Sequence, residues 1–140
     1  MTLQIVDPIA WVKASRQRFF PGGRFDVFRL LAYVMADVLE LGGGECRIVR
    51  RDSWWFVVSD VDWLVHDAIP VSDLFQRVVP APAHGEHSMR AEVLLNAYAD
   101  DVYTAKEADE LIVKGGAPDR KLIQPLLIGG QRIVGFRVAP

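Results

Sequence analysis

The chain has a single cysteine, Cys46, among its 140 residues, so it lacks the sulfur ligands and pairs of a disulfide scaffold or a thiolate metal site. In an expected strand, this thiol is best explained as a small buried hydrophobe. The start of the chain also lacks a basic segment followed by an apolar run, which a secretory leader requires. Both absences predict a cytoplasmic protein.

Long uninterrupted apolar runs are missing as well. The longest mostly apolar segment, 25–41, contains Asp26, Arg29, Asp37 and Glu40. Such charges are costly in hydrocarbon, so we expect no membrane association. Hydrophobic residues nevertheless make up 51% of the chain and charged residues 24%. This composition and this length predict one globular domain over residues 1–140.

The net charge is only −2, but the charges are unevenly distributed along the chain. Residues 1–51 hold eight basic and five acidic side chains, residues 52–112 hold three and twelve, and residues 113–140 hold five and one. An acidic middle repels phosphate, and neither basic end contains a dense run of Lys or Arg. The sequence therefore predicts no nucleic-acid partner.

Signatures of catalysis and of cofactor binding are absent. The glycine pairs do not follow a strand and open a helix, as phosphate-binding loops do. Ser59, Ser72 and Ser88 are better explained as helix caps than as nucleophiles. His84 and His87 share one loop, but a zinc site of this kind needs a matched second pair of ligands. We expect no cofactor and no metal.

Hydrophobic periodicity and capping signals predict helices over 8–19, 24–41, 60–65, 70–79, 88–99 and 105–114. Runs of β-branched and aromatic residues predict strands over 45–51, where they alternate with polar residues, over 53–59, which is apolar on both faces, and over 121–128 and 131–138. The last two are separated by Gly129-Gly130, the pattern of a two-residue hairpin loop. The expected fold is α+β: an antiparallel sheet built from two hairpins, about 45–59 and 121–138, with helices packed against it.

The helix expected over 24–41 has apolar residues around most of its circumference, because its polar residues fall on one line. Either it lies between the sheet and other helices, or part of its surface forms a subunit interface. The outward side chains of the hairpin 121–138 are a second surface that must be covered. These surplus apolar surfaces favour a homodimer.

Four tryptophans and an acidic stretch indicate a candidate binding site, although ordinary core packing also explains the tryptophans. Trp54 and Trp55 are adjacent in a strand, so they point to opposite faces. A pocket walled by Trp55 and Trp63 beside Asp60 and Asp62 suits a cationic or aromatic small molecule. The candidate ligand-binding residues are Trp55, Asp60, Asp62, Trp63 and His66.

The sequence thus favours a non-catalytic binding or interaction module for a protein partner or a small ligand. Apolar surfaces and an acidic segment are present, whereas no nucleophile–base pair is recognisable. The alternative is a small hydrolase that uses the acidic and histidine-containing segment 60–67. The two hypotheses differ in whether Asp60, Trp63 and His66 converge on one cavity.

Overall fold

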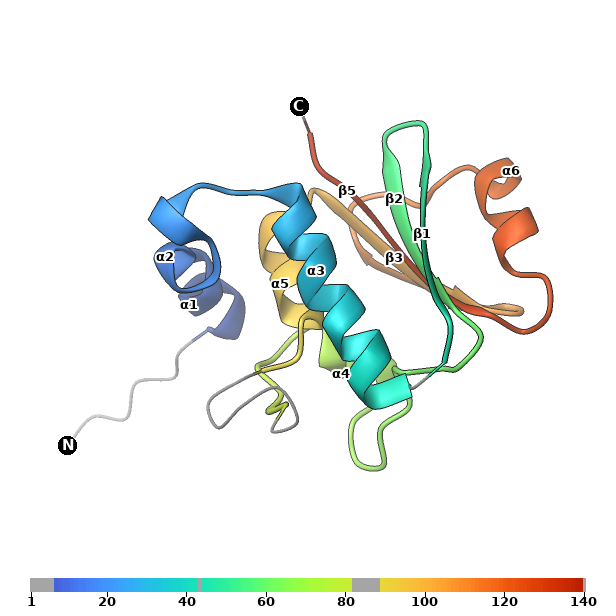
Figure 1. Ribbon diagram of the computed structural model, residues 1–140, viewed down its shortest axis with the longest axis horizontal. Helices are drawn as coiled ribbons and strands as arrows, with labels where there is room; N and C mark the ends of the chain where they lie inside the picture. Colours follow the sequence, from blue (N-terminus) through green and yellow to red (C-terminus); the bar gives the residue numbers. More distant parts are fainter. Residues whose placement is uncertain (1–6, 43, 82–88, 140) are drawn as a thin grey trace.

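The computed structural model describes residues 7–42, 44–81 and 89–139 and is built around a five-stranded sheet (Figure 1). All neighbouring strands are antiparallel, in the order β1-β2-β5-β3-β4. The predicted α+β class is confirmed. The strands are β1 (Cys46–Arg51), β2 (Trp54–Ser59), β3 (Asp101–Lys106), β4 (Asp109–Lys114) and β5 (Arg132–Arg137).

Helices cover both faces of the sheet and divide the core in two (Figure 1). On one face, α3 and α5 pack over Val57, Val102 and Phe136, and α1 packs against α5. On the other face, α6 and the turn after it bury Phe56 and Ile133. The helices are α1 (Pro8–Ala14), α2 (Arg16–Phe19), α3 (Val27–Asp37), α4 (Val71–Leu74), α5 (Glu92–Tyr98) and α6 (Arg120–Ile123). Short 3-10 turns span Pro21–Gly23 and Gln124–Leu126, and a π turn spans Val38–Gly42.

Local capping explains where the first helices begin. The Asp7 carboxylate accepts hydrogen bonds from the backbone N–H groups of Ile9 and Ala10, as an N-cap does. The predicted helix 8–19 forms, but it breaks at Ser15 into α1 and α2. Asp26 caps α3 by accepting from the N–H of Phe28 at 2.9 Å, so this helix begins three residues later than predicted.

The first predicted hairpin is confirmed, with β1 and β2 joined by a two-residue turn at Asp52 and Ser53. Strand β2 lies inside the sheet, between β1 and β5. Its side chains alternate between the two cores: Trp54 belongs to the α6 side, whereas Trp55 packs against the α3 side. The opposite orientation of the adjacent tryptophans is therefore as predicted.

The predicted helix over 105–114 is wrong, because these residues form β4 and its hairpin turn with β3. Thr104 is a strand residue whose hydroxyl donates to the carbonyl of Ile133 at 2.7 Å, rather than a helix cap. Glu107 has φ of 53° and so reverses the chain between the two strands. Leu111, Ile112 and Val113 suit a strand, and pairing with β3 overrides the helix signals at the segment ends.

The second hairpin predicted over 121–138 is also wrong in its first half. Residues 120–126 form α6 and a 3-10 turn, with the Asp119 carboxylate accepting from the N–H of Lys121 at 2.9 Å. The predicted strand 131–138 does form, but as the central strand β5 between β2 and β3. Pro125, which a strand could hold only at a sheet edge or a bulge, lies in the 3-10 turn.

The acidic middle is less helical than predicted. No helix forms over 60–65, because the Ser59 hydroxyl and the Asp62 carboxylate accept from the N–H groups of Val61 and Leu64 in tight turns. Only one helical turn, α4, forms within 70–79. The segment from β2 to α4 is therefore an irregular loop held by side-chain hydrogen bonds.

Gly135 of β5 has Phe56 and Tyr103 as its cross-strand neighbours. A Cβ atom there would lie 2.7 Å from a ring carbon of Phe56, which is fully buried and has no room to move. We expect Gly135→Ala to lower the free energy of unfolding by about 1–3 kcal/mol, as measured by urea denaturation. Gly116→Ala is the control, because its Cβ would meet only one atom, at 3.8 Å. Equal losses in both variants would contradict this interpretation.

Candidate functional site

Trp55, one of the five candidate residues, lines an open pocket of about 500 Å³. The pocket lies where the start of α3, the β1–β2 hairpin and the end of the chain meet. Its walls are Phe25, Asp26, Val27, Phe28, Arg50, Trp55, Val138 and Ala139. We call this the Trp55 pocket.

Three side chains define the chemistry of the Trp55 pocket. Phe28 meets Trp55 edge to face, with ring centroids 5.8 Å apart. The guanidinium carbon of Arg50 lies 4.6 Å from the centre of the Trp55 ring, which is a cation–π contact. Phe28 is 66% exposed even though it contacts Trp55. The pocket is therefore aromatic, with one cationic wall.

The backbone explains why these side chains meet. In the β1–β2 register Arg50 lies opposite Trp55, so both side chains project from the same face of the sheet. The Asp26 cap fixes the first turn of α3 and with it the position of Phe28. Sequence reasoning missed Arg50 and Phe28 as site residues. A two-residue turn at 52–53 is enough to place Arg50 opposite Trp55. For Phe28, the available signal was the excess apolar surface of the helix expected over 24–41.

The other four candidate residues do not line the Trp55 pocket. The Asp60 carboxylate accepts from the backbone N–H of Glu45 at 2.8 Å. Trp63 is a buried core residue. The exposed imidazole of His66 accepts, through Nδ1, from the N–H groups of Ala68 and Ile69. Each of these three therefore has a local structural role.

Asp62 forms a two-pronged ion pair with Arg132, with both N–O distances at 2.9 Å. Lys106 lies 3.8 Å from the same carboxylate. Burial by itself raises the pKa of Asp62, but the hydrogen bonds and charge of Arg132 outweigh it, and the net pKa is lowered. The pair ties the loop after β2 to β5 and keeps Asp62 ionised.

A second group of charged side chains is buried, and the sequence alone did not identify it as a group. Arg90 Nε donates to Glu92 at 3.0 Å and Arg90 Nη2 donates to the carbonyl of Trp63 at 3.0 Å. Asp37, at the end of α3, accepts from the N–H of Ala91 at 2.7 Å. We call Asp37, Arg90 and Glu92 the buried charge cluster.

Burial, together with the neighbouring Asp37 charge, raises the pKa of the Glu92 carboxyl to about 7. Burial also raises the pKa of Asp37. Asp37 falls on the polar line of the helix expected over 24–41, where a charged side chain ordinarily faces solvent, and no motif singled out Arg90 or Glu92. Asp37 and Glu92 are instead at the junction of α3 and α5, where no local pattern predicts burial.

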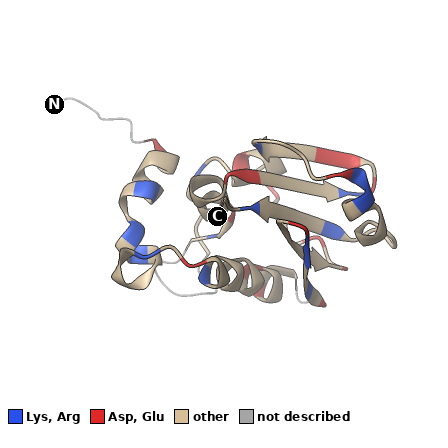
Figure 2. Cartoon of the chain, turned by 90° about the horizontal axis from the view of Figure 1, so that it is seen from above, with Lys and Arg blue, Asp and Glu red and all other residues tan. Residues whose placement is uncertain are grey.

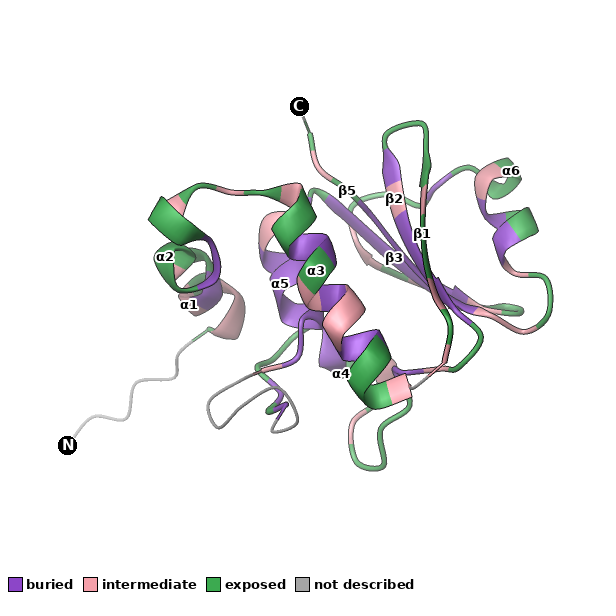
Figure 3. Cartoon of the chain, in the orientation of Figure 1, coloured by how far each residue is buried: buried purple, intermediate pink, exposed green. Residues whose placement is uncertain are grey.

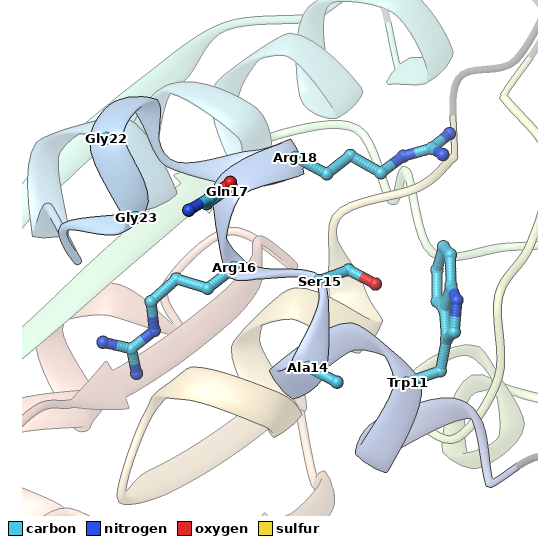
Figure 4. A pocket seen from close by; sticks show the side chains of 8 residues that line it. All are labelled: Trp11, Ala14, Ser15, Arg16, Gln17, Arg18, Gly22 and Gly23. Carbon is cyan, nitrogen blue, oxygen red and sulfur yellow. The ribbon is translucent and has the colours of Figure 1, made fainter.

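A second open pocket, of about 630 Å³, lies beside α1 and α2 (Figure 4). Two arginines line it, but Figure 4 shows their side chains pointing in opposite directions. Arg16 lies over the ring of Tyr98 and Arg18 over the ring of Trp11, each at 5.6 Å. The two guanidinium groups do not converge, so this pocket is not a built anion site.

Across residues 7–42, 44–81 and 89–139, no three His, Cys, Asp or Glu side chains are arranged to hold a metal ion. His84 and His87, for which we expected no metal, lie outside the described residues. In the part of the chain that the structure describes, no helix has the length and apolar character needed to cross a bilayer. Comparisons with models of protein families, with curated proteins and with solved structures gave no match.

Proposed function

We propose that this protein is a non-catalytic interaction module that binds an apolar or aromatic side chain of a protein partner in the Trp55 pocket. The exposure of Phe28 carries the proposal, because a large aromatic ring that is 66% exposed beside a second aromatic ring is costly in water. Aromatic residues and arginine are also the types enriched at the energetic centres of protein interfaces. The pocket volume falls within the usual range for binding sites, about 300–1,000 Å³.

The hydrolase alternative has no comparable support in the described residues. Asp60 and Asp62 are engaged by the N–H of Glu45 and the guanidinium of Arg132. His66 contacts backbone N–H groups of its own loop rather than a hydroxyl that it could activate. Neither pocket described above is lined by any of these three side chains.

A titration with N-acetyl-tryptophanamide, followed by two-dimensional NMR of the labelled protein, tests the proposal. We expect saturable shifts centred on Phe28, Arg50 and Trp55. Phe28→Ser should weaken binding roughly fivefold, because an aromatic pair contributes about 1 kcal/mol. Ile128→Ser removes a similarly exposed apolar side chain that does not line the Trp55 pocket and should leave binding unchanged. Shifts that do not saturate, or that survive Phe28→Ser in full, would refute the proposal.

A further inference from the structure

Strand β1 is an open edge of the sheet beside the Trp55 pocket (Figure 1). It pairs with β2 on one side, and none of the described residues pairs with its other side. Alternate residues of such a strand direct backbone N–H and C=O groups away from the sheet, ready to pair with another strand. Figure 3 shows the contrast with the central strands, which are buried along most of their length whereas β1 is not.

The two faces of the β1 edge have different chemistry. Arg47 and Arg51 pair with Val58 and Trp54, so they project on the α6 side of the sheet. Ile48 pairs with Val57 and projects on the α3 side, where it remains 38% exposed. One face of the edge is therefore cationic at both ends, and the other face carries the exposed apolar side chain of Ile48 together with Arg50, which lies over Trp55.

The arginines of β1 have no acidic partner within the described segments. Arg47 donates to the side-chain oxygen of Gln131 at 3.0 Å, and Arg50 lies over Trp55. No carboxylate of those segments forms an ion pair with Arg47, Arg50 or Arg51. The opposite edge strand, β4, begins with Asp109 and Glu110 and ends with Lys114, whereas β1 carries three arginines and no acidic residue (charged residues are coloured in Figure 2).

An apolar stripe follows the flank of α3 that carries Phe28. Tyr33 donates its hydroxyl to the carbonyl of Phe19 at 2.6 Å, which orients one flank of α3 toward α2. Phe28 contacts Trp55 on the opposite flank. Ala32 and Met35 follow Phe28 at spacings of four and three, so they share its flank. Leu39, in the π turn that follows α3, is 56% exposed.

We propose, on the basis of the proposed function, that the partner of this module is an extended acidic peptide segment that adds to β1 as a further strand. Its backbone pairs with the free edge, and alternate side chains face opposite ways. Acidic side chains on one face meet Arg47 and Arg51. Apolar side chains on the other face cover Ile48, and one aromatic side chain enters the Trp55 pocket.

Two other occupants fit these observations less well. A second copy that pairs β1 with β1 would bring arginines opposite arginines, and like charges directly across a ladder are destabilising. Single-stranded nucleic acid stacks its bases on free aromatic faces. Arg50 already lies over one face of the Trp55 ring, and Phe28 meets the ring edge to face. An acidic strand pairs with the open backbone edge, places carboxylates beside Arg47 and Arg51, and covers the apolar side chain of Ile48.

The test measures fluorescence anisotropy of a labelled short peptide that alternates aspartate with phenylalanine or isoleucine. We expect saturable binding that weakens at least about tenfold when alternate peptide amides are N-methylated, because this change removes strand pairing and keeps the side chains. Arg47→Glu with Arg51→Glu should weaken binding about tenfold or more. The control, Arg77→Glu with Lys121→Glu, makes the same change in net charge at exposed positions outside β1 and should have little effect.

Several outcomes would overturn this inference. Binding that is insensitive to N-methylation excludes strand addition, and equal losses in the two double variants indicate non-specific charge attraction. Displacement of the peptide by oligothymidylate would assign the surface to nucleic acid. A doubled mass in sedimentation that is lost on Arg47→Glu with Arg51→Glu would assign it to a second copy. If no peptide binds while N-acetyl-tryptophanamide still shifts Phe28 and Trp55, the strand inference fails and the proposed function stands.

Discussion

Arg90→Met is expected to lower the free energy of unfolding by about 3–5 kcal/mol at neutral or higher pH, because it leaves two carboxyl groups buried without the cation that they share. Arg90 lies between a backbone carbonyl and Glu92, and both side chains are almost wholly removed from water. Removing the guanidinium also leaves the carbonyl of Trp63 without this donor. Urea denaturation of both proteins, monitored by tryptophan fluorescence, measures the difference.

The loss is expected to depend on pH. In the native protein the pKa of Glu92 is raised from 4.5 to about 7, so folding takes up a proton between these values. This contribution to stability is complete below about pH 4.5 and is lost as the pH rises through about 7. Without Arg90 the carboxyl pKa values rise further, so Arg90→Met should be least damaging in mild acid, where protonation costs little.

The double variant Arg90→Met with Glu92→Leu is the matched control for the Arg90 prediction. It removes the cation and one carboxyl together, and replacement of a buried ion pair by apolar residues is often close to neutral. We therefore expect it to recover most of the stability lost in Arg90→Met. A loss in Arg90→Met below about 1 kcal/mol, or one that is the same from mild acid to mild alkali, would contradict the assignment of a buried charge cluster.

Leu31→Ala is expected to lower the free energy of unfolding by about 2–5 kcal/mol, because it removes a buried side chain and leaves a cavity. Leu31 is 3% exposed and belongs to the core between α3, α5 and the sheet. Leu39→Ala is the control: it makes the same chemical change in the same helical segment at a side chain that is 56% exposed. Its effect should stay within about 0.5 kcal/mol, as is usual for surface positions.

These two leucines refine what the sequence indicated about the helix at 24–41. The pattern puts apolar residues, Leu31 and Met35 among them, around most of the helix circumference, so it does not distinguish buried from exposed positions. The structure buries Leu31, leaves Met35 half-buried and exposes Leu39. Similar unfolding losses for Leu31→Ala and Leu39→Ala would mean that the outer flank of α3 is covered in solution.

The sequence by itself determined those elements whose signals are local. Asp7 and Asp26 cap helices through bonds to N–H groups two or three residues away. The β1–β2 hairpin follows from a β-branched strand and a continuous apolar strand on the two sides of a two-residue turn, and that turn also fixes Arg50 opposite Trp55. Such contacts involve residues close in the chain, so a short window of sequence contains the information.

Only the tertiary structure decided whether two short segments form helices or strands, and which charged side chains are buried. Residues 105–114 and 121–128 are too short for their periodicity to separate helix from strand, and pairing with β3 or packing on Phe56 determined the outcome. Asp37 meets Glu92 through contacts between segments more than fifty residues apart. Whether a carboxylate on a helix is exposed or buried depends on which segment packs over it. No local sequence pattern specifies that segment.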